Sequence, residues 1–166
     1  MTMVEDLIEQ YFSQKDVTQR HQILKEITFK CEHASKEFFE NAFKKERKLE
    51  EKLTALRGFA YYASEQEVEP YANKLRESIL KIPKTTPYAY NLYEDIRAAY
   101  LLPYLVKTYN YPCFIELRNQ VEKQYEDMPD VFKNIYSYDE NGQFYQIRDP
   151  REVKRAIDEF LRQKRS

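Results

Sequence analysis

Apolar residues recur every three or four positions along most of the chain, which is the period of an amphipathic helix. Helix-start signals fall where this period predicts new helices. Asp16 is placed to cap one helix, with Gln19 three residues on, and Ser64 and Glu67 form a capping box before another. The predicted helices cover residues 4–13, 16–31, 34–46, 48–63, 64–82, 86–108, 112–128 and 149–162.

The helix predicted for residues 86–108 has two non-polar faces. At about 100° per residue, one quarter-turn of its surface carries four tyrosines and an arginine. Aliphatic residues occupy the opposite side, so this helix either is enclosed in a core or presents its aromatic side to a partner, and the sequence leaves both open. Pro103 lies deep inside the helix and predicts a kink or a break. The residues of the aromatic side are Tyr90, Tyr93, Arg97, Tyr100 and Tyr104.

The pattern changes to strict alternation between residues 134 and 148, around Asn141-Gly142. This dipeptide between alternating residues is typical of a β-hairpin with a type I′ turn. A turn centred there pairs Tyr138 with Tyr145 and Tyr136 with Ile147. One face of the hairpin is then aromatic, and we expect it to pack on helices because an isolated hairpin is marginally stable.

Composition narrows the class of protein. The chain has 166 residues, enough for a single domain, and a net charge of −1. It therefore lacks the basic excess of a general nucleic-acid or membrane-surface binder. Two glycines are too few for most nucleotide-binding loops. Cys31 and Cys113 are expected to be free thiols, because no signal peptide or membrane-spanning run is evident, and we expect a cytoplasmic protein.

A loose repeat runs through the helices. Leu56-Arg57-Gly58 on one predicted helix is followed by Glu69-Pro70, and about 40 residues later Ile96-Arg97-Ala98 is followed by Tyr111-Pro112. A period near 40 is typical of HEAT and armadillo repeats. Residues 48–126 therefore resemble the HEAT-type helical repeat family.

The resemblance implies a fold and a role for two arginines. The implied fold is mainly α, a superhelix of stacked antiparallel helical hairpins, with the β-hairpin near 134–148 added. Residues 130–166 would cap a single domain of residues 1–166. In such stacks an arginine at the position of Arg57 and Arg97 pairs with an acid or with carbonyls between repeats, or faces a ligand. Tyr100 stands where the family has an alanine.

Catalytic and metal-ligating residues are sparse. Cys31 and His33 are two positions apart, so on a helix they point in different directions and cannot act together. Cys31 continues an apolar stripe and is expected to be a buried thiol. His33 and Glu37 are expected to make a surface contact, since a metal site needs further ligands. The sequence therefore predicts no catalytic residues, no metal and no cofactor.

Two acids interrupt the aromatic helix. Glu94 and Asp95 are expected to form an ion pair with Arg97 or Arg57, and a cleft position with a raised pKa is the alternative. We interpret the protein as a non-enzymatic helical-repeat protein that binds a protein or peptide through Tyr90, Tyr93, Arg97, Tyr100 and Tyr104.

Two other functions are kept as alternatives. One is a HEAT-like nucleic-acid-binding or DNA-repair enzyme, although such enzymes use tryptophans and a basic groove, and this chain has no tryptophan. The other is an architectural subunit of a larger assembly, and a homo-oligomer is left open. By analogy alone, a small tyrosine-rich helical protein of this kind suits a bacterial toxin-neutralising or regulatory partner.

Overall fold

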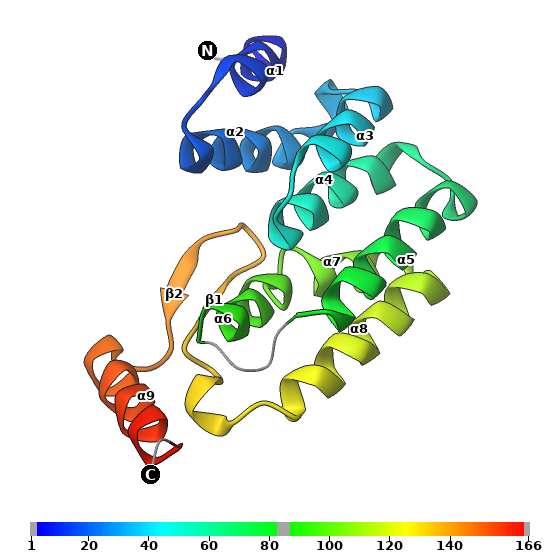
Figure 1. The fold of residues 1–166 in the computed structure, drawn as a ribbon. Coiled ribbons are helices and arrows are strands. Elements are labelled where there is room, and N and C mark those ends of the chain that lie inside the picture. The colour runs from blue at the N-terminus through cyan, green and yellow to red at the C-terminus, as the bar shows by residue number, and fades with distance from the viewer. Residues whose placement is uncertain (1–2, 83–86, 165–166) are drawn as a thin grey trace. The chain divides into compact units, whose positions relative to one another are not determined.

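The computed structural model describes residues 3–82 and 87–164, apart from the side chains of residues 87–90. The chain is mainly helical with one small antiparallel sheet, as predicted (Figure 1). It forms two compact units, Met1–Lys74 and Leu75–Ser166, and one helix runs from the first into the second. The expectation of a single domain capped by residues 130–166 stays a prediction.

Short helices with a shared apolar core build the first unit. Two of them start at the predicted caps. The Gln19 amide donates to the Asp16 side chain at 2.9 Å, and Ser64 and Glu67 each accept a hydrogen bond from the other's backbone N–H. In chain order the elements are α1 (Val4–Ser13), α2 (Val17–Phe29), the 3₁₀ helix η1 (Cys31–His33), α3 (Lys36–Lys45), α4 (Leu49–Tyr62) and the first part of α5 (Glu65–Leu80).

Helices α3 and α4 approach closely at Gly58. A Cβ atom added there would lie 2.2 to 2.4 Å from three ring atoms of Phe39. Phe39 is completely buried and its ring meets that of Phe38 edge-on, with 5.1 Å between the centroids. The ring therefore has little room to move, and the missing side chain at position 58 sets the spacing of the two helices.

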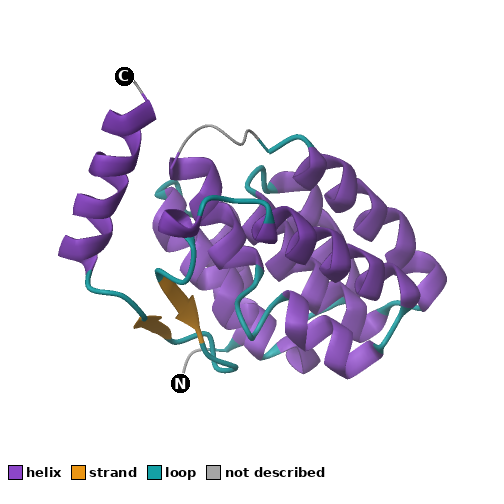
Figure 2. Cartoon of the chain, turned by 90° about the horizontal axis from the view of Figure 1, so that it is seen from below, coloured by secondary structure: helices purple, strands orange, loops and turns teal. Residues whose placement is uncertain are grey.

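The second unit contains the hairpin and its supporting helices. Figure 2 shows the last helix near the two strands. In chain order its elements are the end of α5, then α6 (Pro87–Ile96), α7 (Leu102–Tyr109), α8 (Pro112–Glu126), η2 (Asp130–Phe132), β1 (Tyr136–Tyr138), β2 (Phe144–Gln146) and α9 (Pro150–Lys164).

The helix predicted over residues 86–108 is broken. α6 ends at Ile96 and α7 begins at Leu102. The sequence predicted either a kink or a break, and the structure has a break. Pro103 lies in the first turn of α7, where its missing N–H needs no helical partner. In the turn between the helices, the Ala99 N–H donates to the Tyr138 carbonyl of β1 at 3.2 Å. Thr86, where the predicted helix begins, lies outside the described residues.

The hairpin forms, but its predicted register is wrong by one residue. Tyr138 pairs with Phe144, and Tyr136 with Gln146. The loop has five residues rather than two, because Asp139 organises it. The Asp139 carboxylate accepts hydrogen bonds from the Asn141 and Gln143 amides at 2.8 and 2.9 Å. Of the two residues Asn141 and Gly142, only Gly142 has a positive φ, 76°, whereas a type I′ turn needs a positive φ at both.

Two further boundaries differ from the sequence pattern. α2 ends at Phe29, so Cys31 lies in η1 and is half-buried rather than buried in a helical stripe. Pro70 lies inside α5, whereas Pro112 is the first residue of α8, so the two copies of the repeat pattern are not equivalent. None of the helices in the described ranges has the length and apolar character needed to cross a membrane.

Candidate functional site

The tyrosine and arginine residues predicted to form a binding face do not share one exposed surface. Tyr93 and Tyr100 are buried, with 2% and 8% of their surface exposed, and Tyr104 is half-buried. Because the helix breaks after Ile96, Tyr100 and Tyr104 no longer follow Tyr93 along one helix. The side chain of Tyr90 lies outside the described residues. Of the two arrangements that the sequence leaves open, a core position and a face presented to a partner, Tyr93 and Tyr100 have the core position.

Tyr93 connects three helices of the second unit. The Gln124 side-chain amide of α8 donates to the Tyr93 hydroxyl oxygen at 2.8 Å. The same amide donates to the Ile79 carbonyl of α5 at 3.1 Å. A buried hydroxyl with its polar atom in a hydrogen bond is characteristic of a core residue.

Arg97 is held by groups of α8. Its Nε lies 2.8 Å from Glu122 Oε1, and its guanidinium carbon lies 3.7 Å from the centroid of the Tyr125 ring. The side chain is 27% exposed. Pairing with an acid is one of the roles that the repeat pattern implies for this position. Arg57, its counterpart in the pattern, lies with its guanidinium carbon 4.5 Å from the centroid of the Phe29 ring.

Glu94 does not form the predicted ion pair with Arg97 or Arg57. It is 2% exposed, and Oε1 accepts hydrogen bonds from the Tyr125 hydroxyl at 2.6 Å and the Asn134 amide at 3.1 Å. Burial raises the pKa of Glu94, and these two hydrogen bonds oppose that rise. The group therefore connects α6, α8 and the segment before β1.

Asp95, the second acid of this helix, also bonds to a hydroxyl. Tyr136 of β1 donates to Asp95 Oδ1 at 2.9 Å. This bond and the one from Ala99 to Tyr138 both join the hairpin to the helices at β1. These hydrogen bonds therefore attach the hairpin to the helices through β1, and Figure 1 shows β1 between β2 and α6.

The change of hairpin register decides on which side of the sheet each side chain of β2 lies, although all three residues of β2 are exposed, Phe144 at 55%. Phe144 lies on the side that faces the helices, where its ring centroid is 5.3 Å from that of Tyr136 and 5.6 Å from that of Tyr138. Tyr145 and Ile147 lie on the opposite side, 48% and 49% exposed. With the predicted pairing they would have joined the packed side, because a slip of one residue exchanges the faces of a strand. We call the side of Tyr145 and Ile147 the outer hairpin face.

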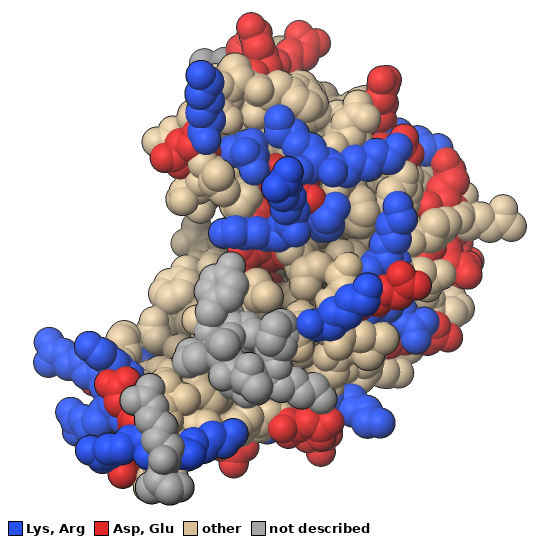
Figure 3. Space-filling model, in the orientation of Figure 1, with Lys and Arg blue, Asp and Glu red and all other residues tan. Residues whose placement is uncertain are grey.

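Helix α9 follows the hairpin directly and has an exposed charged side. Five Lys/Arg and three Asp/Glu lie between residues 150 and 164. Figure 3 shows Lys and Arg side chains gathered over α9, with acidic side chains among them. The apolar side of α9 is partly covered by η2, since the rings of Phe160 and Phe132 meet edge-on with 5.5 Å between their centroids.

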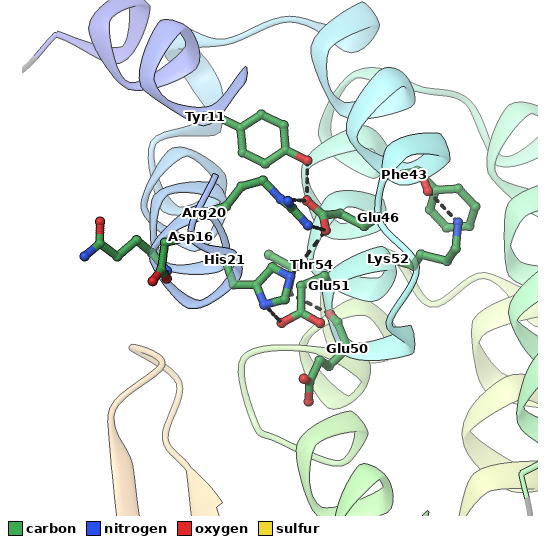
Figure 4. A network of polar contacts seen from close by, with 11 residues as sticks. Tyr11, Asp16, Arg20, His21, Phe43, Glu46, Glu50, Glu51, Lys52 and Thr54 are labelled. Atoms are coloured by element: carbon green, nitrogen blue, oxygen red, sulfur yellow. Dashed lines mark hydrogen bonds and ion pairs between the residues drawn. The ribbon is translucent and has the colours of Figure 1, made fainter. Parts of the chain in front are cut away.

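A buried polar network crosses the first unit (Figure 4). Its centre is Glu46, 1% exposed, at the end of α3. Tyr11 of α1 donates to Glu46 Oε2 at 2.5 Å, and Arg20 of α2 donates through two nitrogens at 2.9 and 3.1 Å. His21 Nε2 lies 3.3 Å from Glu46 Oε1, and His21 Nδ1 lies 2.7 Å from Glu51 Oε1 in α4. The network therefore joins four helices.

The network fixes the charge of its members. Burial by itself would lower the pKa of His21, but the hydrogen bonds to Glu46 and Glu51 outweigh it and raise the pKa to about 9. Burial would raise the pKa of Glu46, but the hydrogen bonds from His21, Arg20 and Tyr11 lower it to about 2. At neutral pH, His21 is consequently a cation between acidic groups, which is a structural arrangement rather than that of a general base.

Sequence reasoning missed this network. His21 has no local sequence signal, and Tyr11 fits the helical period as one more residue of the apolar side of its helix. Glu46 is 35 residues from Tyr11, so no helical spacing relates them. A buried acid in the turn between two helices is recognisable only when the surrounding helices are in place.

The described residues contain no site suited to metal binding, since no three His, Cys, Asp or Glu side chains are grouped to hold an ion. Burial raises the pKa of the Cys31 thiol, which disfavours the reactive thiolate. His33 is exposed and lies 3.6 Å from Glu32, not beside Glu37. The one described side-chain atom that is buried without a hydrogen-bond partner is Glu51 Oε2, in the network of the first unit.

Comparison with protein-family models, with curated proteins and with solved structures gave no match to this chain. The polar clusters of both units are buried and satisfy their own hydrogen bonds almost completely. The outer hairpin face and α9 carry the exposed apolar and cationic groups from which a binding surface can be made.

Proposed function

We propose that this chain is a non-enzymatic helical protein that binds a protein or peptide partner through the outer hairpin face, together with the cationic side chains of α9. The observation that carries the proposal is that Tyr145 in β2 and Ile147, one residue beyond its end, are each about half exposed. Tyrosine offers a large contact area and a polar tip, and it is enriched among residues that dominate binding energy.

The anchoring of the hairpin supports this role. Tyr136 and Tyr138 pack on the inner side, the Asp95 carboxylate holds the Tyr136 hydroxyl, and Ala99 holds the β1 backbone. The outer side chains are therefore presented by a strand whose position is fixed before any partner arrives. Pre-organisation of this kind reduces the entropy lost on binding.

The residues of the predicted tyrosine and arginine site have different roles in this proposal. Arg97 and Tyr104 retain part of their surface and are kept as contact residues. Tyr93 and Tyr100 are assigned to packing because they are buried. The cationic groups of α9 favour a partner with acidic groups, since complementary charge speeds encounter and suppresses wrong partners.

We propose also that the helices are arranged as a HEAT-like stack. Support comes from the short turns that join long helices: Ala63-Ser64 separates α4 from α5, and Asn110-Tyr111 separates α7 from α8. Asn110 adopts a left-handed conformation with φ of 53° and ends α7, which suits a tight helix–helix turn. The break between α6 and α7 is a departure from the family pattern.

A paired affinity capture tests the binding surface. The wild-type chain and a Tyr145→Ser, Ile147→Thr double variant are immobilised in equal amounts, and the captured proteins are identified and quantified. We expect a specific partner to be retained by the wild type and reduced at least about tenfold on the variant, as for the loss of a small hot spot.

A matched control uses Tyr61→Ser, which removes a tyrosine that is 51% exposed in the first unit. This variant should retain the partner at the wild-type level, and all three proteins should show the same thermal unfolding. A partner captured equally by the hairpin variant would assign the interaction to another surface and reject the outer hairpin face.

A further inference from the structure

Strand β2 has an open edge. Along the hairpin, the Asp139 N–H donates to the Gln143 carbonyl and the Ile147 N–H to the Ile135 carbonyl. In an antiparallel pair, the backbone groups of every second residue point toward the partner strand. The two bonds above involve residues 143 and 147, so on this side of the hairpin the odd-numbered residues point toward β1, including Tyr145 opposite Ser137. The backbone N–H and C=O groups of Phe144 and Gln146 therefore point away from β1.

No residue in the described ranges supplies a backbone hydrogen bond to that edge. All three residues of β2 are exposed. The other edge of the hairpin is different, because the Ala99 N–H occupies the Tyr138 carbonyl. The sheet therefore has one protected edge and one edge available for pairing.

Edge strands that remain single are usually protected by short length, a charge, a proline or a bulge. β2 has only three residues, but the segment Phe144-Tyr145-Gln146 contains no charge and no proline. Its exposed side chains are apolar or neutral, and Phe144 and Tyr145 are 55% and 48% exposed. An unprotected edge of this composition is suited to strand addition.

We propose that β2 pairs antiparallel with β2 of a second copy of this chain, so that two hairpins form one four-stranded sheet across a two-fold axis at Tyr145. The backbone groups of Phe144 and Gln146, which point away from β1, determine this register. Phe144 of one copy and Gln146 of the other exchange two backbone hydrogen bonds, and the two-fold repeats them, giving about four new ladder bonds.

Side chains and charges agree with this register. Tyr145 faces its own symmetry mate in the closer, non-hydrogen-bonded type of pair, where aromatic side chains contact best. Antiparallel pairing also brings the acidic tip of one hairpin, Asp139 and Glu140, toward the end of the other strand, which is followed by Arg148 and Arg151. A parallel arrangement would instead place like charges together.

The pairing goes beyond the proposed function but is compatible with it. The four-stranded sheet places two copies of Tyr145 and Ile147 on one side, which doubles the outer hairpin face. Self-association needs no partner, so it is measured on the purified chain alone. The two proposals can therefore fail separately.

The first test measures the molar mass by sedimentation over a hundredfold range of protein concentration. The wild type should rise from the mass of the 20.2 kDa chain toward twice that value. Gln146→Pro removes an N–H that the hairpin does not use, and Tyr145→Lys places two like charges opposite each other. Both variants should remain monomeric at every concentration, while Tyr61→Lys should associate as the wild type does.

Circular dichroism at equal concentration verifies that Gln146→Pro and Tyr145→Lys retain the wild-type helix content. Gln146→Pro also leaves Tyr145 and Ile147 in place, so it separates self-association from partner capture. A wild type that stays monomeric throughout the range overturns the proposal. So does a dimer that both variants leave intact.

Cysteine cross-linking tests the register itself. At the symmetric position the two Cα atoms would lie roughly 4.5 Å apart, within the range that a disulfide can bridge. Tyr145→Cys should form a covalent dimer under mild oxidation, and Tyr61→Cys, equally exposed, should not. Equal cross-linking of the two variants, or none at position 145, overturns the two-fold register.

Discussion

At the scale of single residues, His21 links its protonation to the stability of the first unit. Its pKa is raised from 6.5 to about 9 by Glu46 and Glu51. A raised pKa means that the folded state binds the proton more tightly than the unfolded state does. The stabilisation is complete below pH 6.5 and is lost as the pH rises through about 9.

We predict that His21→Gln removes this pH dependence. The shift corresponds to a contribution of about 3 kcal/mol to the free energy of unfolding at pH 6. Urea unfolding of the wild type between pH 6 and pH 9.5 should show falling stability. The variant should be less stable at pH 6 and should lose much less stability over the same range.

His33→Gln provides the control, because His33 is exposed and outside the network. Its unfolding free energy should follow the wild-type pH profile. If His21→Gln kept the full wild-type decline, the stabilisation would have to come from groups other than this imidazolium.

Glu94 shows why individual partners are hard to predict. Arg97 follows it at position i+3, and the sequence alone favours an ion pair. In the structure the Tyr125 hydroxyl and the Asn134 amide bind the carboxylate, and Arg97 pairs with Glu122 instead. Tyr125 and Glu122 both belong to α8, so the choice of partner depended on how α8 packs against α6.

At the scale of elements, Gly58 determines how α3 and α4 pack. Helix propensity alone predicts that Gly58→Ala stabilises α4 by about 1 kcal/mol. We expect the opposite sign, because the new methyl group would overlap the buried Phe39 ring. Overpacking of this kind costs about 1–3 kcal/mol, and the melting temperature should fall.

A double-mutant cycle identifies the cause of this loss. Phe39→Leu is made alone and in combination with Gly58→Ala, and the unfolding free energies are compared. Relief of the overlap predicts that the double variant is more stable than the sum of the single changes implies. Simple additivity would show that the Phe39 ring is not what opposes a side chain at position 58.

The register of the hairpin and the position of the helix break also depend on more than the local sequence pattern. Asn141-Gly142 correctly predicted a hairpin, but the Asp139 carboxylate selected a five-residue loop and with it the other register. Pro103 correctly predicted an interruption. Its exact place was set by the hydrogen bond from Ala99 to the hairpin, which requires an open turn before α7.

At the scale of the whole molecule, charge balance distinguishes between the proposed function and the nucleic-acid alternative. With a net charge of −1, we predict no salt-dependent retention of duplex DNA on a gel between 50 and 200 mM salt, a range over which a protein with several phosphate contacts loses roughly a thousandfold in affinity or more.

The positive control for this assay is a charge variant of α9. In this variant Glu152, Asp158 and Glu159 are replaced by lysine, so all charged residues of the helix are cations. The variant should retain duplex DNA on the gel, and added salt should abolish that retention. If the wild-type protein retained duplex DNA with the same salt dependence, the nucleic-acid alternative would be favoured over the proposed partner-binding function.

The sequence by itself determined the helical character of the chain, most helix limits, the caps at Asp16 and Ser64, and the existence of the hairpin. These features depend on hydrogen bonds and periodicity within a few residues, so neighbouring positions suffice to specify them. Only the tertiary structure decided which aromatic residues are buried.

Tyr93 and Tyr100 are core residues, and Tyr145 lies on the outer side of the hairpin because the strand register is shifted by one residue. The Glu46 network likewise joins residues separated by 35 positions. Such contacts depend on how whole elements pack against one another, and no local pattern in the chain records that packing.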